Sequence, residues 1–217
     1  MNFRSYYQRL KTYWQKWICL LFQKRPTLIL GVGGAGCNIV EYICQKSNLE
    51  FDLAVCNTDK QALDLCKVDK KIQLGKIETQ GLSTGRKALL GEAAANESME
   101  ELNKLIKSYK SLIIIASLGG GTGSGGGYCI AKSSKELGLL TQAILIHPFA
   151  FEGNKTLKNA SQWKLKLKTV CQEVQVKSND MITDKYGQEM TTRAFDLMNE
   201  EIFKDLQKLL KKKRLKV

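Results

Sequence analysis

Two glycine-rich segments are the residues of this sequence whose types and spacing best suit phosphate binding. The first, Gly31–Gly36, reads Gly-Val-Gly-Gly-Ala-Gly, and the second, Gly119–Gly127, holds seven glycines in nine residues. Because glycine has no Cβ, its backbone N–H can approach a phosphate oxygen closely, and a helix that starts there adds partial positive charge. Thr122 and Ser124 offer hydroxyl donors within the second segment. One such segment suggests a phosphate, and two on neighbouring strands suggest a polyphosphate.

Each segment also has an alternative interpretation. Gly31–Gly36 satisfies the dinucleotide fingerprint G-x-G-x-x-G, which is a weak signal by itself because many folds use it. Binding of a nicotinamide dinucleotide is therefore the alternative there. For Gly119–Gly127 the alternative is a flexible Gly/Ser linker. A linker is disfavoured because the run lies between the apolar segment Leu112–Ala116 and a predicted helix, with no room to act as a spacer.

Segments with the periodicity of strands and helices alternate from Thr27 onward. We predict strands at residues 27–30, 51–56, 71–74, 112–116, 142–147 and 174–177. We predict helices at residues 35–46, 59–66, 88–108, 126–137, 156–170 and 191–215. This alternation predicts a three-layer α/β fold, a mostly parallel sheet with helices on both faces. Ligands of such sheets bind outside the carboxyl ends of the strands, where both glycine segments fall.

The first 25 residues are predicted to form one amphipathic helix with an aromatic face and a basic face. Aromatic rings and basic side chains suit the interface of an anionic membrane. The uninterrupted apolar run Trp17–Phe22 is too short to span a bilayer, and no signal-peptide cleavage site follows it. We expect this helix to attach to a membrane surface. Packing on the domain and binding to a protein partner are the alternatives.

Basic residues are concentrated at the two ends of the chain. Residues 1–25 and 204–217 together carry 12 of the 13 net positive charges. A nucleic-acid-binding protein more often carries its charge on the folded body, so we expect no nucleic-acid partner. Seven cysteines without a Cys-x-x-Cys pair, together with one histidine, argue against a zinc site. They are typical of reduced, buried thiols, so we expect a cytoplasmic protein at the inner face of the membrane.

The second glycine segment also resembles a family signature. Gly119–Gly125 reads Gly-Gly-Gly-Thr-Gly-Ser-Gly, which looks like the signature loop of the tubulin and FtsZ family. Other segments resemble FtsZ motifs in the same order, at residues 30–38, 54–59, 61–63, 148–153, 179–180, 195 and 199. The resemblance covers about residues 27–207. It implies the family's Rossmann-like GTP-binding domain, placed at residues 26–190 between the terminal helix 1–25 and a truncated central helix 191–217.

The resemblance implies GTP or GDP as the ligand, with Mg²⁺ as an optional companion. It implies phosphate contacts from both glycine segments, a ribose contact from Glu152 and a nucleoside contact from Asn179. Phe195 would stack on guanine and Asn199 would read its edge, although a core position is the alternative for Phe195. The nucleotide-binding residues so assigned are Gly33, Gly34, Ala35, Asn38, Gly85, Arg86, Gly119, Gly120, Gly121, Thr122, Gly123, Ser124, Glu152, Asn179, Phe195 and Asn199. No catalytic residue and no metal ligand is assigned.

The sequence departs from the family pattern within the domain. A basic pair, Arg86 and Lys87, occupies the loop that senses the terminal phosphate, where relatives usually carry small or amide residues. Either side chain could hold that phosphate, and a solvated pair is the alternative. The family's arginine after the Glu-Gly motif is Thr156 here, with Lys155 as a candidate replacement. Arg193 replaces an acid that precedes the stacking phenylalanine.

The sequence ends within the segment that resembles the family's central helix. In the family, that helix continues into an acidic loop that reaches the next subunit's nucleotide and positions water, and then into a second domain. We therefore expect hydrolysis to be weak or to depend on a partner subunit. We also expect that the six apolar side chains of residues 198–210 cannot all face one core, so that part of the helix is exposed or paired.

Together these features predict a guanine-nucleotide-binding, FtsZ-like cytoskeletal protein. It would attach to the membrane and join, cap or regulate filaments of a full-length relative in cell division. Its expected partners are a guanine nucleotide, a full-length FtsZ-like subunit and an anionic membrane surface contacted by residues 1–25. The alternatives are a stand-alone slow GTPase that uses Arg86 as an internal charge clamp, and a non-catalytic module with an empty pocket.

Overall fold

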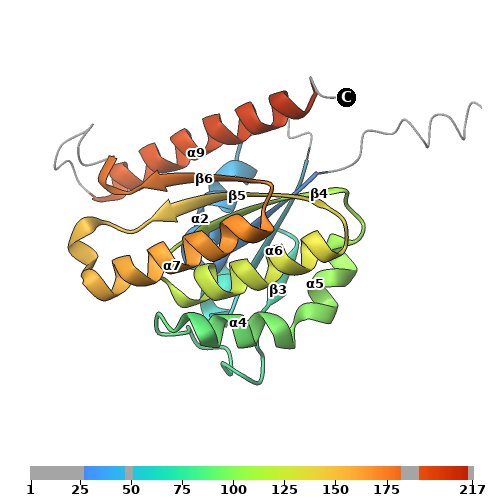
Figure 1. Cartoon of the computed structure of the whole chain (residues 1–217), viewed down its shortest axis with the longest axis horizontal. Coiled ribbons are helices and arrows are strands. Elements are labelled where there is room, and N and C mark those ends of the chain that lie inside the picture. The colour runs from blue at the N-terminus through green and yellow to red at the C-terminus, as the bar shows by residue number, and fades with distance from the viewer. Residues whose placement is uncertain (1–26, 47–50, 182–190, 215–217) are drawn as a thin grey trace, which may run out of the picture.

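The computed structural model describes residues 27–46, 51–181 and 191–214, and in the last helix the side chains of residues 195–210. The expected helix at residues 1–25 lies outside the described residues. Six parallel strands form one sheet in the order β3-β2-β1-β4-β5-β6 (Figure 1). Their bounds are β1 Thr27–Val32, β2 Asp52–Asn57, β3 Lys71–Gln73, β4 Ser111–Ser117, β5 Leu140–His147 and β6 Glu173–Ser178.

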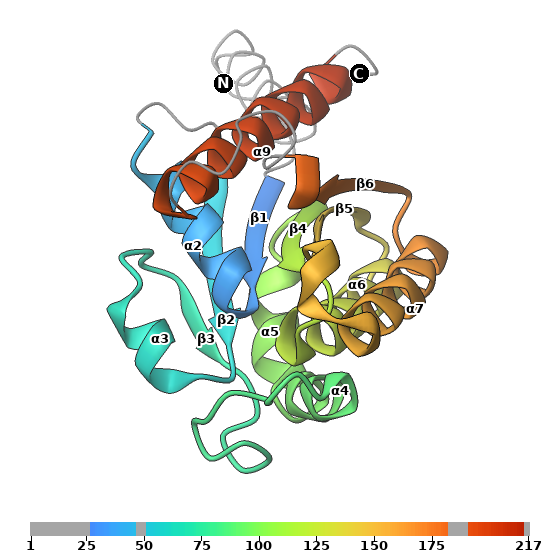
Figure 2. The ribbon, with the colours of Figure 1, turned by 90° about the vertical axis from the view of Figure 1, so that its left-hand side faces the viewer.

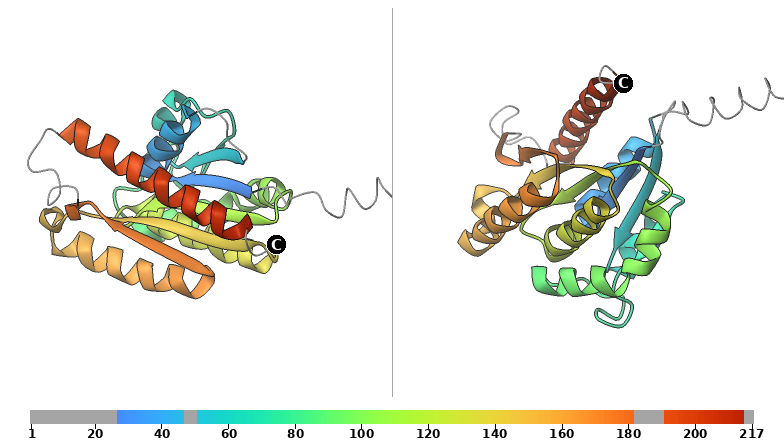
Figure 3. Two further views of the ribbon diagram at one scale, coloured as in Figure 1. Left: turned by 90° about the horizontal axis from the view of Figure 1, so that it is seen from above. Right: turned by 45° about the vertical axis from the view of Figure 1, so that its right-hand side comes forward.

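Helices cover both faces of this sheet (Figure 3), which confirms the predicted fold class. One face carries α2 (Gly33–Cys44), α3 (Lys60–Leu65) and α9 (Thr191–Arg214). The other carries α4 (Ala88–Glu97), α5 (Met99–Ile106), α6 (Gly127–Glu136) and α7 (Asn154–Val170). A π-helix, η1 (Thr122–Gly126), leads into α6, and a short 3-10 helix, η2 (Ala150–Glu152), precedes α7. None of the described helices is long and apolar enough to cross a lipid bilayer.

Side chains of β4 alternate between two apolar cores, one on each face of the sheet. Ile113 and Ile115 pack in the core beneath α2 and α9, whereas Leu112 and Ile114 pack in the core beneath α4 to α7. All four side chains are fully buried. A strand that is covered on both faces reads as a continuous apolar run, which explains the uniform character of residues 112–116.

The six apolar side chains of residues 198–210 all pack against one core, so the expectation that they could not was wrong. Four are buried in the core shared with α2, and two are half-buried against it: Met198, Ile202, Leu206, Leu209, Phe203 and Leu210. Their spacing of mostly three or four residues places them along one stripe of the helix. The polar residues between them are exposed or half-buried, except Asp205, which is buried and pairs with Lys177 of β6 at 2.6 Å. The helix is therefore an integral layer of the domain.

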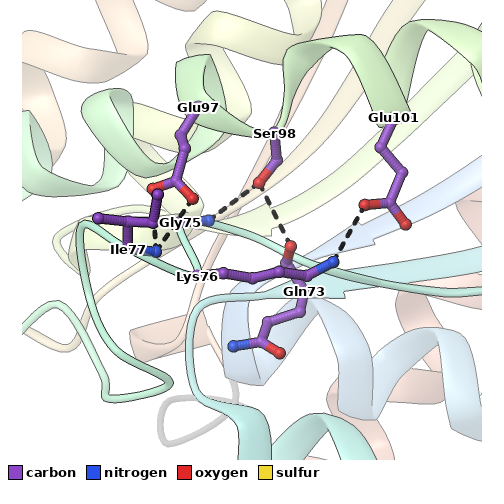
Figure 4. Close-up of polar contacts among 7 residues, drawn as sticks. All are labelled: Gln73, Gly75, Lys76, Ile77, Glu97, Ser98 and Glu101. Atoms are coloured by element: carbon purple, nitrogen blue, oxygen red, sulfur yellow. Dashed lines mark hydrogen bonds and ion pairs between the residues drawn. The ribbon is translucent and has the colours of Figure 1, made fainter.

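The single helix predicted at residues 88–108 is two helices, α4 and α5, which meet at Ser98. The Ser98 hydroxyl accepts a hydrogen bond from the Gly75 N–H at 3.0 Å and donates one to the Gln73 carbonyl at 3.3 Å (Figure 4). These bonds hold the junction of the helices against the chain that leaves β3. Helical periodicity continues across the break, so periodicity alone does not reveal it.

Candidate functional site

The carboxyl edge of the sheet brings the two glycine segments together. The strand order reverses between β1 and β4, and such a switch point opens a crevice in an open α/β sheet. Val32 at the end of β1 pairs in register with Ala116 near the end of β4, so both segments begin at the same level. Figure 2 looks onto this edge, where α2, α7 and the loop before α4 surround the strand ends.

The two segments pack directly on each other. Gly33 has a positive φ of 74°, and a Cβ added there would lie 3.1 Å from the Gly123 nitrogen and 3.3 Å from the Thr122 Cβ. A side chain at Gly33 would therefore be strained and crowded. The contact brings the start of α2 and the start of η1 together at one glycine-rich site, which we call the glycine cradle.

Several glycines of the second segment serve packing and not an exposed surface. A Cβ at Gly125 would overlap the Ala88 carbonyl, one at Gly91 of α4 would overlap the Gly121 carbonyl, and one at Gly123 would overlap the Ser117 carbonyl. The backbones of α4 and η1 thus touch. A π-helix is a rare element that often marks functional sites, and here it lets this close approach occur beside the cradle.

Both hydroxyls of the second segment are engaged inside the protein. The Ser124 Oγ is fully buried and accepts a hydrogen bond from the Gly119 N–H at 3.1 Å. The Thr122 Oγ1 shares a hydrogen bond with the Thr58 Oγ1 at 3.0 Å and a longer one with the Thr84 Oγ1 at 3.5 Å. These bonds tie η1 to the end of β2 and to the loop before α4. Backbone N–H groups are then the main donors that this segment can offer to an anion.

Thr58 and Thr84 were missed by sequence reasoning, although both lie in segments that it had singled out. Thr58 stands within the Asn57-Thr58-Asp59 motif, and Thr84 directly precedes Gly85. Both are buried, at 0% and 5% exposure. For Thr58, the available signal was a polar residue shortly after the predicted strand at residues 51–56, and for Thr84 it was the neighbouring Gly85.

The start of α2 presents open backbone donors. Its N-cap residue, Val32, makes no side-chain capping bond, and the first turn holds no acidic residue. Gly34, Ala35 and Asn38 are exposed in this part of the helix. The first N–H groups of a helix lack internal partners and lie at the positive end of its dipole, so this end suits an anion.

The loop between β3 and α4 is anchored at its start by Glu97. The carboxylate of Glu97 accepts a hydrogen bond from the Ile77 N–H at 3.0 Å (Figure 4). It accepts another from the Glu78 N–H at 2.9 Å. These bonds, the Glu78 N–H first, hold the pKa of Glu97 below its ordinary value. Lys76 of the same loop pairs with Glu101 at 3.5 Å. The loop therefore leaves β3 in a fixed direction.

The end of that loop carries Arg86, which reaches across to the opposite side of the cradle. Gly85 and Arg86 both have positive φ values, 55° and 65°. The Arg86 Nη1 donates a hydrogen bond to the Thr156 Oγ1 at 3.4 Å, and its Nη2 lies 3.8 Å from the Glu152 Oε2. Two departures from the family pattern that are 70 residues apart in sequence thus meet. The cation bonded to the Thr156 hydroxyl is Arg86, and not the neighbouring Lys155.

Glu152 is fixed by its own turn. Its Oε1 accepts a hydrogen bond from the Phe149 N–H at 3.0 Å, and its carbonyl accepts one from the Thr156 hydroxyl at 3.1 Å. The Phe149 ring stacks on Phe151, with centroids 4.8 Å apart. The Glu152 side chain is 25% exposed, so its carboxylate can still contact a ligand.

The remaining predicted residues come from β6 and α9. Asn179 follows β6 directly, is half-buried, and donates its backbone N–H to the His147 carbonyl at 3.1 Å. Phe195 is 54% exposed, and Asn199 is half-buried one turn further on. α9 begins on the side of the molecule where β5 and β6 end (Figure 1). The other predicted residues lie in the segments that follow β1, β3, β4 and β5 at the same edge.

Cysteine and acidic residues near the cradle show no reactive or metal-binding arrangement. Burial raises the pKa of Cys37, in the first turns of α2, to about 12, and its thiol donates to the Cys56 carbonyl at 3.6 Å. A protonated, buried thiol is a poor nucleophile. Across the part of the chain that the structure describes, no three His, Cys, Asp or Glu side chains gather as metal ligands would.

Comparison with known proteins identifies the family. The family model described as "Tubulin/FtsZ family, GTPase domain" matches residues 26–187. Cell division protein FtsZ of Aquifex aeolicus is 35% identical over 85% of this chain and 48% of its own length. The mitochondrial division protein fszA of Dictyostelium discoideum is 35% identical over 82% of this chain and 34% of its own. This chain therefore spans between a third and a half of the length of these relatives.

Solved structures agree with the sequence match. An empty FtsZ dimer from M. jannaschii superposes with a TM-score of 0.78 at 33% identity, covering 89% of this chain and 55% of that one. A GTPγS-bound protofilament of CetZ2 from Haloferax volcanii superposes with a TM-score of 0.77 at 25% identity, covering 85% and 58%. The glycine segments, the parallel sheet and the matched family model agree, and the chain belongs to the tubulin/FtsZ family.

Proposed function

We propose that this chain binds a guanine nucleotide, with its phosphates in the glycine cradle. The observation that carries the proposal is the direct contact of Gly33 with Thr122 and Gly123, which joins two phosphate-type loops at the switch point of the sheet. The open N-terminus of α2 adds positive potential from one side, and Arg86 adds a charge from the other. A polyphosphate fits such a pair of loops better than a single phosphate does.

In this proposal the nucleoside lies toward β6 and the start of α9. Glu152 would accept from the ribose, and Asn179 would contact the nucleoside. Phe195 supports a stacking role because it stays 54% exposed on a helix whose other large apolar side chains are buried or half-buried. Asn199, one turn away, offers a donor and an acceptor to the guanine edge.

Mg²⁺ would be held mainly by the nucleotide. The described residues form no cluster of three carboxylate, imidazole or thiol ligands. Mg²⁺ commonly binds through substrate phosphates, waters and at most one or two carboxylates, so this composition is compatible with it. When bound, the ion would neutralise phosphate charge.

The central experiment is nucleotide analysis of the purified, denatured protein, followed by titration with fluorescent GDP and competition by GTP and ATP. We expect guanine nucleotides to bind and ATP to compete poorly. Phe195→Ala should weaken binding by about 10-fold, the magnitude of a lost base-stacking contact. Leu65→Ala, at an 81%-exposed apolar site on α3, is the matched control and should bind normally. Absence of any bound or bindable guanine nucleotide would leave the non-catalytic module as the better interpretation.

We further propose that the nucleotide edge meets another subunit of the family, as part of a cell-division or related cytoskeletal function. The FtsZ dimer and the CetZ2 protofilament among the similar structures support this, since both are assemblies. Leu82 and Phe151, which follow β3 and β5, are 69% and 79% exposed. Exposed apolar side chains around one edge favour a protein contact.

Sedimentation with a full-length FtsZ tests this contact. We expect the chain to change the amount or length of sedimenting filaments in the presence of GTP, and Leu82→Asp to remove the effect. GTP turnover measured with and without the partner separates two versions of the function. Turnover by the chain alone, lost in Arg86→Ala, would favour the stand-alone slow GTPase over the filament partner.

Residues 1–25 are proposed to attach the protein to the inner face of the membrane. The support is their amphipathic sequence, with six basic residues, no acid and several aromatic rings. Flotation with anionic vesicles should recover the intact chain and lose the chain that lacks these residues. Equal recovery of both would overturn the membrane role and favour a packing or protein-binding helix.

A further inference from the structure

The Arg86 side chain reaches from one side of the glycine cradle to the other. The loop before α4 lies on one side, and the start of α7 lies on the other. The loop before α4 rests on η1: Thr84 shares a hydrogen bond with Thr122, and a Cβ at Gly121 would come 2.7 Å from the Lys87 carbonyl oxygen. On the α7 side, a Cβ added at Gly119 would meet the side chain of Thr156. The guanidinium therefore spans the glycine segment from the loop before α4 to the start of α7.

The contacts that hold Arg86 there are weak. The distance of 3.8 Å to the Glu152 carboxylate is an ion pair without a hydrogen bond, and the hydrogen bond to Thr156 is long at 3.4 Å. The Arg86 side chain is 66% exposed, so solvent screens the pair. A guanidinium has five N–H donors in a planar fork, and it forms its strongest pairs with phosphate and carboxylate in bidentate geometry. The observed geometry leaves most of that capacity unused.

The backbone at Arg86 adds a second reason to assign it a function. A φ of 65° is uncommon for a residue with a side chain, and adopting it has an energetic cost. Glycine would adopt this conformation without that cost, and the preceding residue is already Gly85. The side chain at position 86 is present despite the strain, and the strained backbone is what directs it over the cradle.

We propose that Arg86 is an exchangeable clamp that distinguishes nucleoside triphosphates from diphosphates. In the observed geometry, it contacts Glu152 and Thr156 across the cradle. With a triphosphate, its guanidinium turns to the terminal phosphate and frees the Glu152 carboxylate to accept from the ribose. A diphosphate lacks the group that draws Arg86 away, so it binds with the clamp still competing for Glu152. This inference rests on the proposed nucleotide site and names the residue that sets its specificity.

The test compares GTPγS and GDP affinities by calorimetry for the full-length chain, Arg86→Ala and Lys87→Ala. Lys87→Ala is the matched control, because it removes the same charge at the next residue without removing the clamp. We expect Arg86→Ala to weaken GTPγS binding roughly 10- to 100-fold, as for a lost hydrogen bond to a charged group. The same variant should leave GDP binding unchanged or strengthen it by less than about 3-fold, because Arg86 no longer competes for Glu152. Lys87→Ala should change both affinities by the same small factor.

A third variant, Thr156→Val, tests the exchange itself. Valine keeps the shape of threonine but removes the hydroxyl that accepts a hydrogen bond from Arg86. We expect GTPγS to bind about twofold more tightly, because one weak competing hydrogen bond is gone. Thermal unfolding of each variant verifies that the domain is folded.

The outcomes separate the clamp from the site on which it rests. If the wild-type chain binds neither nucleotide, the proposed function fails and the clamp fails with it. If the wild type binds both, and Arg86→Ala leaves the ratio of the two affinities unchanged, the clamp alone is overturned. A ratio that shifts equally in Lys87→Ala also overturns it, because general charge would then account for the effect.

Discussion

Gly125→Ala tests whether the glycines of the second segment exist for backbone packing. A Cβ at this position would overlap the Ala88 carbonyl and come 2.8 Å from the Glu92 nitrogen. Both neighbours are backbone atoms of α4, so no side chain can rotate away and the helix itself must shift. Overpacking of this kind costs about 1–3 kcal/mol, and a rigid obstacle favours the upper part of that range.

The matched control is Gly127→Ala, two residues further along. A Cβ there would meet only the Ala116 Cβ at 3.7 Å, which is an ordinary contact. Alanine also has a helix propensity better than that of glycine by about 1 kcal/mol, a gain that both variants share. We therefore expect Gly125→Ala to lose about 2 kcal/mol of unfolding free energy, and Gly127→Ala to gain about 0.5 kcal/mol.

Equilibrium unfolding in urea measures the change in unfolding free energy of each variant relative to the wild type. Gly125→Ala should also weaken nucleotide binding, because a displaced α4 moves Thr84 and Arg86 away from η1. A Gly125→Ala protein as stable as the wild type would refute the packing argument, since α4 and η1 could then separate without cost. Equal losses in the two variants would refute it as well, because only one of them has a backbone obstacle.

Two further predictions concern titratable groups. The N–H groups of Glu78 and Ile77 lower the pKa of Glu97 in the folded protein. The ionised carboxylate therefore contributes its full stabilisation above the unfolded pKa of 4.5, and this stabilisation is lost as the pH falls through the lower folded pKa. The stability difference between wild type and Glu97→Gln should therefore shrink on acidification below about pH 4.5; a difference independent of pH would contradict this. Cys37 is buried with a pKa of about 12, whereas Cys44 is exposed. Peptide mass spectrometry after iodoacetamide treatment at pH 8 should find Cys44 modified well before Cys37, and the reverse order would show that the α2 core opens.

The strands β1, β2, β4 and β5 were predictable because each contains a short apolar run bounded by glycine or polar residues. The predicted strand at residues 51–56 and the observed β2 at Asp52–Asn57 differ by one residue at each end. The glycine segments could also be placed at the sheet edge, since the ends of parallel strands share one side. The local sequence pattern was sufficient to locate these strands, and the topology of a parallel sheet was sufficient to place the glycine segments.

The errors arose where contacts between distant residues decide the structure. Ser98 ends α4 through bonds to Gln73 and Gly75, and no helical pattern near residue 98 contains that information. The apolar stripe of α9 packs on α2 and on the sheet, a contact that the helical pattern alone does not specify. Arg86 and Thr156 were considered separately because only the fold brings them within 3.4 Å.

The loop that carries Arg86 is held at several points, and this affects how fast the site can respond. Glu97 holds its first residues, Gly81 accepts a hydrogen bond from the Lys60 N–H at 2.9 Å, and Thr84 is held by Thr122. A backbone fixed in this way leaves only the side-chain torsions of Arg86 free to change. Rotamer changes of an exposed side chain take picoseconds to nanoseconds, whereas loop refolding takes up to microseconds. Recognition of a terminal phosphate at this position would therefore add no delay to diffusional encounter.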